Sequence, residues 1–234
     1  MSRLFWIPFL LPATLALGAP VFAPTGFPFQ DESLHYTIDW PSGLNLGDAH
    51  LNAHKSATGW EFEMSVDAAI PGFAIADHLH SSTNTEGCSV QFERDTSHGK
   101  KKAHEQTDFD YHNGAAHRST LVPGGGTSDQ PISSCAHDAL AFLYFARREL
   151  GQGRVPPQED LYFGAAYLAR LEYTGAQTIQ SNGKPAVTDH VVVSLKGPAS
   201  DFHFEIFFAR DPARTPLSVR IPSSFGTISL ELAR

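Results

Sequence analysis

The sequence predicts a mainly β protein: an antiparallel sheet, either barrel-like or a curved-sheet sandwich, with one main α-helix at about residues 136–150. Three observations support this fold class. Apolar and polar residues alternate along many short segments, which is typical of strands with one buried face. Turn-forming residues separate these segments, and short strands joined by hairpins favour an antiparallel sandwich or barrel. A single segment shows helical spacing instead.

The N-terminus has the pattern of a secretory signal peptide. Arg3 precedes an apolar run from Leu4 to Ala16, which corresponds to the positive n-region and short h-region of such a signal. The run is shorter than the roughly 20 residues that a membrane-spanning helix needs. We therefore expect residues 1–18 to be a signal peptide cleaved after Gly18, with a later cleavage after Ala23 as the alternative.

Residues 19–234 are expected to form a single β-rich domain, because chains of this length are common as one sandwich or barrel. The 17 Phe residues of the chain can supply a core, and no second apolar segment is long enough to span a membrane. The formal net charge of −8 argues against nucleic acid or an anionic membrane surface as a partner. We expect the processed protein to be periplasmic or secreted.

Strand patterns run along most of the chain. The alternation is clearest over residues 60–68, 202–208 and 228–232. Asn113-Gly114 and Asn182-Gly183 suit tight hairpins. The segment Val122–Ser133, with three consecutive glycines, is predicted to be a surface loop. Further strands are predicted, in chain order, at residues 34–40, 44–54, 76–83, 89–94, 103–111, 161–173, 177–181, 187–195 and 217–221.

The helical segment follows the glycine-rich loop. Ser133 or Ser134 is predicted to cap the start of the helix, Asp138 suits the positive end of its dipole, and Gly151 supplies its end. We expect the helix to pack against the sheet through an apolar stripe, whose members fall at helical spacing: Ala139, Phe142, Leu143, Ala146 and Leu150.

The chain has two cysteines, Cys88 and Cys135. In an exported protein two cysteines most simply form a disulfide, which by the chain-entropy model is worth roughly 3–4 kcal/mol for a loop of this size. The alternative is a reactive thiol at Cys135, because a helix N-terminus lowers a thiol pKa and His137 lies two residues on. A Cys-x-His spacing has little specificity, so pairing is favoured.

Twelve histidines raise the question of a metal site. His78 and His80 share one face of a predicted strand, and His50 and His54 share another. A zinc site needs three or four converging ligands, and the sequence has neither an H-E-x-x-H motif nor a C-x-x-C pair. We interpret these histidines as solvated side chains and predict no metal, no cofactor and no catalytic residue.

The helical segment also resembles a known family. Residues 135–148 are similar to the central helix of the domain of unknown function 3108 family, in which an Asp precedes an aromatic-rich stretch and an Arg. The matching residues are Asp138, Tyr144 and Arg147. Residues 88–110 resemble the paired strands before that helix, and the segments around 162–173, 184–195 and 207–220 resemble its closing strands.

The resemblance covers about residues 30–232. It implies an exported envelope protein of Gram-negative bacteria with an antiparallel, barrel-like sheet and one helix. Such a shape is similar to that of envelope lipoprotein carriers, by analogy of fold alone. The family implies no activity and no catalytic residues.

Three functions are compatible with these patterns. The first is a binding or carrier module for an apolar or lipid-like ligand, because barrels of about eight strands can hold one small ligand; a filled interior is the alternative. The second is a structural or interaction module of the envelope that docks a partner protein through a sheet edge or through Val122–Ser133. The third is an enzyme that uses Cys135 or a histidine site.

Overall fold

The computed structural model describes residues 30–70, 73–223 and 226–233. The predicted signal peptide, residues 1–18, lies outside the described residues. Strands of the N-terminal half of the chain are β1 (Glu32–Asp39), β2 (Asn45–Lys55), β3 (Gly59–Ile70), β4 (Phe73–Asn84), β5 (Ser89–His98), β6 (Lys101–Asp110), β7 (Ala115–Thr120) and β8 (Thr127–Pro131). Those of the C-terminal half are β9 (His137–Asp138), β10 (Glu159–Tyr162), β11 (Ala166–Ser181), β12 (Lys184–Lys196), β13 (Asp201–Ala209), β14 (Pro216–Ser223) and β15 (Gly226–Leu232).

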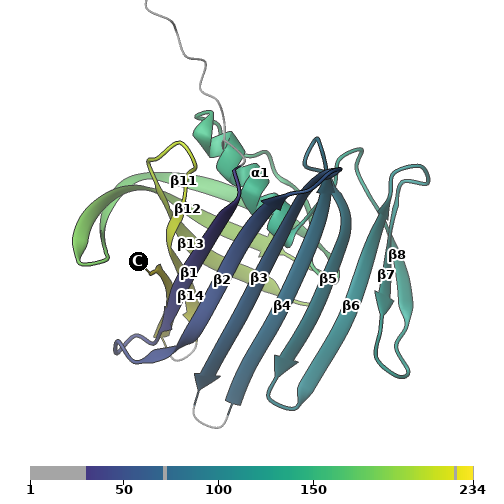
Figure 1. Ribbon diagram of the computed structural model, residues 1–234, viewed down its shortest axis with the longest axis horizontal. Coiled ribbons are helices and arrows are strands. Elements are labelled where there is room, and N and C mark those ends of the chain that lie inside the picture. Colours follow the sequence, from purple (N-terminus) through teal and green to yellow (C-terminus); the bar gives the residue numbers. More distant parts are fainter. Residues whose placement is uncertain (1–29, 71–72, 224–225, 234) are drawn as a thin grey trace, which may run out of the picture.

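These strands form one sheet (Figure 1). Within the described residues its 15 strands have the order β8-β7-β6-β5-β4-β3-β2-β1-β15-β14-β13-β12-β11-β10-β9. Neighbouring strands are antiparallel except β9 and β10, which are parallel. The predicted mainly β fold with one main helix is therefore confirmed.

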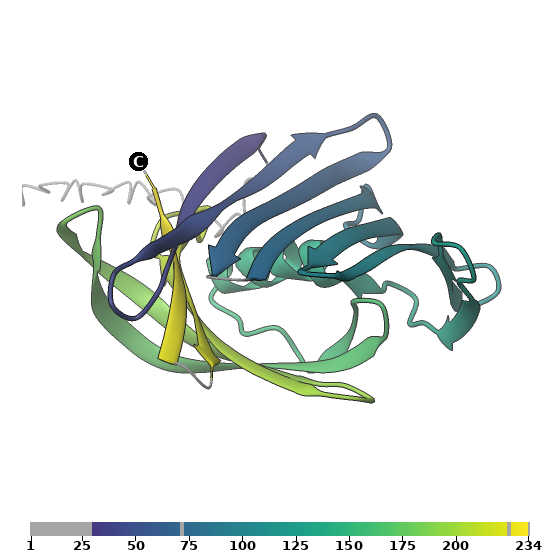
Figure 2. The same ribbon diagram turned by 90° about the horizontal axis from the view of Figure 1, so that it is seen from below.

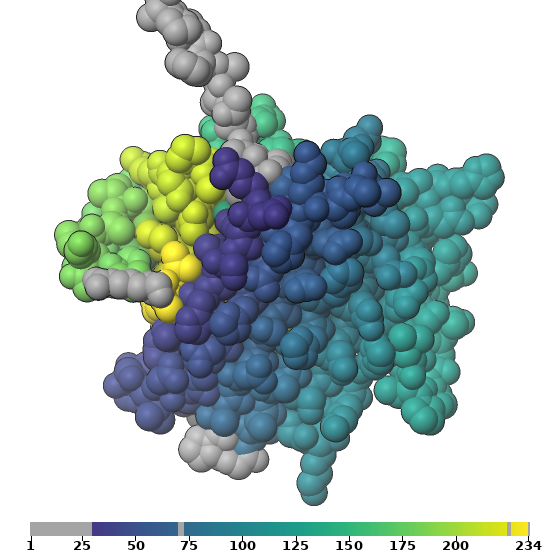
Figure 3. Space-filling model, in the orientation of Figure 1, coloured from purple at the N-terminus to yellow at the C-terminus, as the bar shows by residue number. Residues whose placement is uncertain are grey.

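The two halves of the chain meet along β1 and β15. Tyr36 pairs with Leu232 and Ile38 with Leu230, and Figure 3 shows these two segments side by side on the surface. We call strands β1–β8 the N-terminal half-sheet and strands β9–β15 the C-terminal half-sheet. Figure 2 shows that the sheet curves so that the two half-sheets face each other.

The helix α1 (Ala139–Gly151) lies between the two half-sheets (Figure 2). Leu140 and Tyr144 belong to a core cluster with the N-terminal half-sheet, whereas Phe142 and Leu150 belong to a second cluster with the C-terminal half-sheet. The helix thus buries apolar side chains in two directions, and the interior is filled where the helix lies. Among the described residues, no helix has both the length and the apolarity to cross a bilayer.

The start of the helix differs from the prediction. The helix begins at Ala139, because His137 and Asp138 pair with β10 as strand β9. Its N-cap is Asp138, whose side chain accepts hydrogen bonds from the backbone N–H groups of Leu140 and Ala141. The predicted cap at Ser133 or Ser134 is wrong, and the Ser133 hydroxyl donates to the Cys135 carbonyl instead. The helix ends at Gly151, where the sequence predicted its end.

The strand predictions failed where the strand is polar. The predicted loop Val122–Ser133 contains β8, an edge strand that pairs with β7 alone within the described residues. Its side chains are mostly exposed, so it shows no apolar alternation.

One long strand, β11, replaces parts of two predicted strands and carries a register shift between Tyr173 and Gly175.

The hairpin predicted at Asn182-Gly183 joins β11 to β12. Both residues have positive φ, 52° and 71°, which is the backbone that a tight type I′ turn requires. At the opposite ends of the sheet, β8 and β9 do not pair with each other in the described sheet order. A side chain of β10, the neighbour of β9, reaches β8, because the Tyr162 hydroxyl donates to the Pro131 carbonyl at 2.6 Å. The sheet is therefore barrel-like but open.

Candidate functional site

The first of the three family-motif residues, Asp138, anchors the helix to the N-terminal half-sheet. Its side chain is fully buried. One carboxylate oxygen accepts hydrogen bonds from the hydroxyls of Ser81 on β4 and Ser89 on β5, each at 2.6 Å. Burial raises the pKa of the Asp138 carboxyl, and the hydrogen bonds from both serines and from the helix N–H groups oppose that rise. These contacts make Asp138 a structural anchor.

Tyr144 and Arg147 hold the other end of the helix. The fully buried guanidinium of Arg147 forms a two-pronged ion pair with Glu32 of β1 and donates through Nε to the Ala213 carbonyl at 3.0 Å. The ring of Tyr144 stacks on Phe62, with ring centroids 4.0 Å apart. The motif therefore ties α1 to segments of the chain that are distant in sequence.

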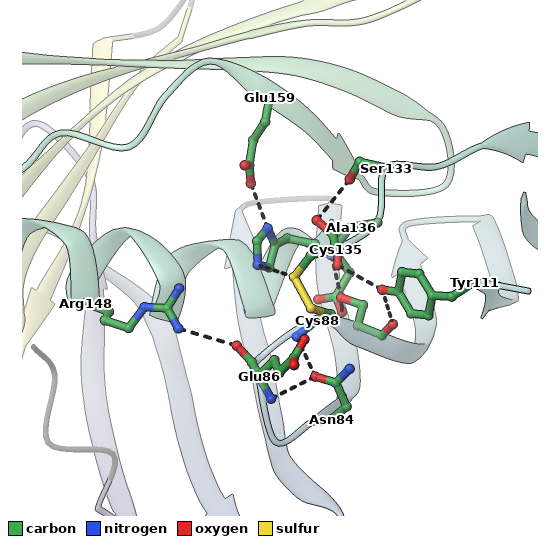
Figure 4. The surroundings of a disulfide bond; sticks show 12 residues. Asn84, Glu86, Cys88, Tyr111, Ser133, Cys135, Ala136, Arg148 and Glu159 are labelled. Carbon is green, nitrogen blue, oxygen red and sulfur yellow. Dashed lines mark hydrogen bonds and ion pairs between the residues drawn. A yellow bond between two sulfur atoms is a disulfide. The ribbon is translucent and has the colours of Figure 1, made fainter. Parts of the chain in front are cut away.

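Cys88 and Cys135 form a disulfide in the structure (Figure 4). The bridge joins the start of β5 to the chain just before β9, where the Tyr111 hydroxyl also donates to the Ser89 carbonyl at 2.7 Å. His137 lies 3.9 Å from the Cys135 sulfur and interacts with Glu159 at 2.7 Å. Because that sulfur belongs to the bridge, Cys135 carries no thiol for nucleophilic chemistry. The bridge is consistent with an exported protein.

The predicted histidine pairs lie on the outer face of the N-terminal half-sheet. His78 and His80 contribute to an open groove of about 400 Å³ that is lined by residues of strands β2, β3, β4 and β5. His50 stacks on His35 with ring centroids 4.6 Å apart, and His54 lies 4.0 Å from Asp31. Within the described residues, no group of three or more His, Cys, Asp or Glu side chains is placed to hold a metal ion.

The inner face of the sheet carries apolar side chains that the helix leaves uncovered. On the C-terminal half-sheet, Phe202 pairs with the half-buried Leu195, and Ile221 lies two residues after Val219 on the same face. Phe202 is 46% exposed and Ile221 is 41% exposed. Val66 of the N-terminal half-sheet is half-buried and packs against the core on the facing surface. The half-sheets thus present apolar surface to each other beyond the two core clusters.

A charged cluster lies on the same inner face. Arg94 of β5 and Arg118 of β7 both form ion pairs with Glu105 of β6, at 2.5 Å for Arg94. The Arg94 guanidinium also lies 4.6 Å from the ring centroid of Phe163. Glu105 is nearly buried, with 8% of its side chain exposed, whereas Arg94 and Arg118 retain 19% and 29%. The cluster therefore borders the solvent.

Sequence reasoning missed this cluster, although the strands carry a signal for it. Arg94 is two residues after the core residue Phe92, and Arg118 is two residues after the buried Ala116. Residues two apart on a strand share a face. A charged residue two positions from a buried apolar residue on the same strand therefore indicates a side chain that points inward and needs a partner of opposite charge.

Glu105 should give the cluster a distinct pH dependence. Burial alone would raise the pKa of Glu105, but hydrogen bonds and charge interactions with Arg118 and Arg94 outweigh it and lower the pKa below its ordinary 4.5. The ionised carboxylate therefore stabilises the fold at pH values above about 4.5, and this contribution is lost as the pH falls through the lowered pKa.

We expect Glu105→Gln to be less stable than the wild type at pH 7, with a difference that shrinks as the pH falls below 4, because a protonated glutamate resembles glutamine. Urea denaturation across this pH range measures the difference. The exposed Glu61 on the outer face supplies the control, Glu61→Gln. A difference that stays constant from pH 7 to pH 3 would contradict the expectation.

A curved antiparallel sheet with a helix between its halves and a partly exposed inner face defines a β-barrel-like protein. The family model described as protein of unknown function DUF3108 matches residues 35–233. The chain belongs to this family, as the resemblance of the helical segment predicted.

One solved structure shares this fold at low sequence identity. A β-barrel-like protein of domain of unknown function DUF1849 from Brucella abortus has a TM-score of 0.64 at 10% identity, over 87% of this chain and 96% of that chain. The lipoprotein LppX from Mycobacterium tuberculosis matches at 12% identity over 86% of this chain and 84% of that chain, but a TM-score of 0.27 is too low to support a shared fold. No curated protein matches the chain.

Proposed function

We propose that this protein binds an apolar, lipid-like ligand on the inner face of its sheet, as a binding or carrier module of the periplasm or the extracellular space. The observation that carries the proposal is the exposure of Phe202 and Ile221 on that face, 46% and 41%. Complete burial of such a side chain is worth about 1.5–3 kcal/mol, and a ligand that covers the remaining exposed part of Phe202 and Ile221 gains a little under half of that for each. A concave apolar surface is the usual setting of a small-molecule site.

The compartment is part of the same proposal. The Cys88–Cys135 bridge supports an oxidising environment, and Arg3 followed by an apolar run supports export. We infer that residues 1–18 are removed on export and that residues 19–234 remain as the functional β-rich domain. Where the helix lies, the interior is filled, so the ligand would occupy the inner surface beyond the helix.

A fluorescence titration with the apolar probe 1-N-phenylnaphthylamine tests the proposal. The protein is purified from the periplasm of an expressing bacterium, where its intact mass also gives the cleavage position. We expect saturable binding, weakened about tenfold or more by Phe202→Glu, because a charge on the apolar surface must be desolvated. Leu168→Glu is the matched control, since Leu168 is a 38% exposed residue on the opposite face of β11.

Two outcomes would contradict the inner-face site. One is the absence of saturable probe binding to the folded wild type. The other is an equal loss in the Phe202→Glu and Leu168→Glu variants. Either result would leave the alternative of an interaction module, for which the edge strand β8 is the docking surface, since a sheet edge can accept a partner strand.

A further inference from the structure

We propose that the ligand is an anionic amphiphile, whose negatively charged head binds Arg94 and Arg118 while its apolar chain lies along the inner face. The inference rests on the proposed function and specifies the chemistry of the ligand. It comes from the charge, the unused donors and the position of the cluster that Arg94 and Arg118 form with Glu105.

The charge of this cluster is opposite in sign to that of the whole chain. Two guanidinium groups share one carboxylate, so the cluster carries a net positive charge, whereas the chain has a formal net charge of −8. The inward carboxylate of Asp77 on β4 lies outside this cluster and is hydrogen-bonded to His98 at 2.8 Å. Within the cluster, one guanidinium charge is therefore left over after Glu105 is paired, and this charge attracts an anion.

The hydrogen-bonding capacity of the two arginines exceeds what Glu105 uses. Within the described residues, the Nε atoms of Arg94 and Arg118 are buried without a hydrogen-bond partner. A guanidinium has five N–H donors in a fork that matches a carboxylate or a phosphate. The Nε atoms are buried, so the 19% of Arg94 and 29% of Arg118 that remain exposed lie on other atoms of these side chains, and a second anion can approach those atoms from the solvent.

The cluster continues an apolar row. Met64 pairs with Leu79, Leu79 with Arg94, and Arg94 with Glu105, so these residues follow one another across the inner face of adjacent strands. Neighbouring strands lie about 4.8 Å apart. The half-buried Phe163 contacts Arg94 and packs against both core clusters. A charged head at Arg94 thus has apolar surface immediately beside it, which suits an amphiphile and not a free anion.

Displacement of the bound naphthylamine probe by decanoate and by 1-decanol at pH 7.5 tests the inference, because these ligands have the same chain length and differ in charge. We expect decanoate to compete about tenfold better than decanol, since a hydrogen bond between a guanidinium and a carboxylate is stronger than one to a neutral hydroxyl. Acetate at the same concentration should displace nothing, because it lacks the chain.

Arg118→Gln should weaken decanoate about tenfold and leave decanol unchanged. Arg170→Gln is the matched control, since Arg170 lies on the outer face of β11 with 67% of its side chain exposed, and it should change neither ligand. The wild-type comparison of acid and alcohol needs no variant, so the inference stays testable if Arg118→Gln does not fold.

The outcomes separate the two proposals. Equal competition by decanoate and decanol would overturn the charged head site and leave the apolar ligand site standing. Displacement by acetate would indicate a simple anion site and overturn the amphiphile. Absence of any probe binding to the folded wild type would overturn the proposed function itself.

Discussion

Replacing Arg147 by alanine should lower the free energy of unfolding by about 3–5 kcal/mol, the usual cost of breaking a buried ion pair by removing one partner. Arg147 is fully buried and pairs with Glu32, whose side chain is only 16% exposed. The variant would leave this carboxylate in a poorly solvated place and would also remove the hydrogen bond to the Ala213 carbonyl. Chemical denaturation followed by circular dichroism measures the loss.

The adjacent residue supplies the control. Arg148 retains 30% of its side-chain exposure, and its hydrogen bond to the Glu86 carbonyl is long, at 3.4 Å. Arg148→Ala should therefore cost about 1 kcal/mol or less, as for exposed ion pairs. The double variant Glu32→Ala with Arg147→Ala should cost less than the sum of the two single variants. Equal losses for Arg147→Ala and Arg148→Ala would refute the anchoring role.

Removing the disulfide should have a similarly large effect. Cys88→Ser and Cys135→Ser should each lower the free energy of unfolding by about 2–5 kcal/mol, because the bridge constrains the unfolded chain. It spans a sequence separation of 47 residues and fixes the segment before the helix to β5. Denaturation of the variants, and of the wild type with and without reductant, measures this contribution.

The pairing itself gives a second test of the bridge. The double serine variant should cost little more than either single variant, since each single change already removes the same bond. Thiol titration of the denatured, unreduced protein should find no thiol, and reduction should release two. Additive costs of the two substitutions, or thiols before reduction, would contradict a permanent bridge.

The sequence allowed the strands and the helix to be predicted because their signals are local. Alternation over residues 60–68 follows from one strand with one buried face, and it corresponds to β3. The apolar spacing predicted the helix. Its start lies three residues later than predicted, because His137 and Asp138 pair with β10 as strand β9. The strand β8 escaped prediction because an exposed edge strand needs no apolar face.

The candidate site was predicted less well. The sequence indicated an aromatic interior and pointed to Asp138, Tyr144 and Arg147 by resemblance, but their anchoring contacts depend on partners elsewhere in the chain. Arg147 meets Glu32 across a sequence separation of 115 residues. The charged cluster was overlooked because its three members lie on three different strands, and none forms a motif by itself.

By itself, the sequence determined the fold class, the main helix and the family, because each depends on residue patterns within a short stretch of chain. The tertiary structure alone decided that β1 pairs with β15, that the helix fills part of the space between the half-sheets, and that Arg94 and Arg118 share one carboxylate. The physical reason is that a two-residue period specifies which face of a strand is buried, but not which strand or side chain lies opposite.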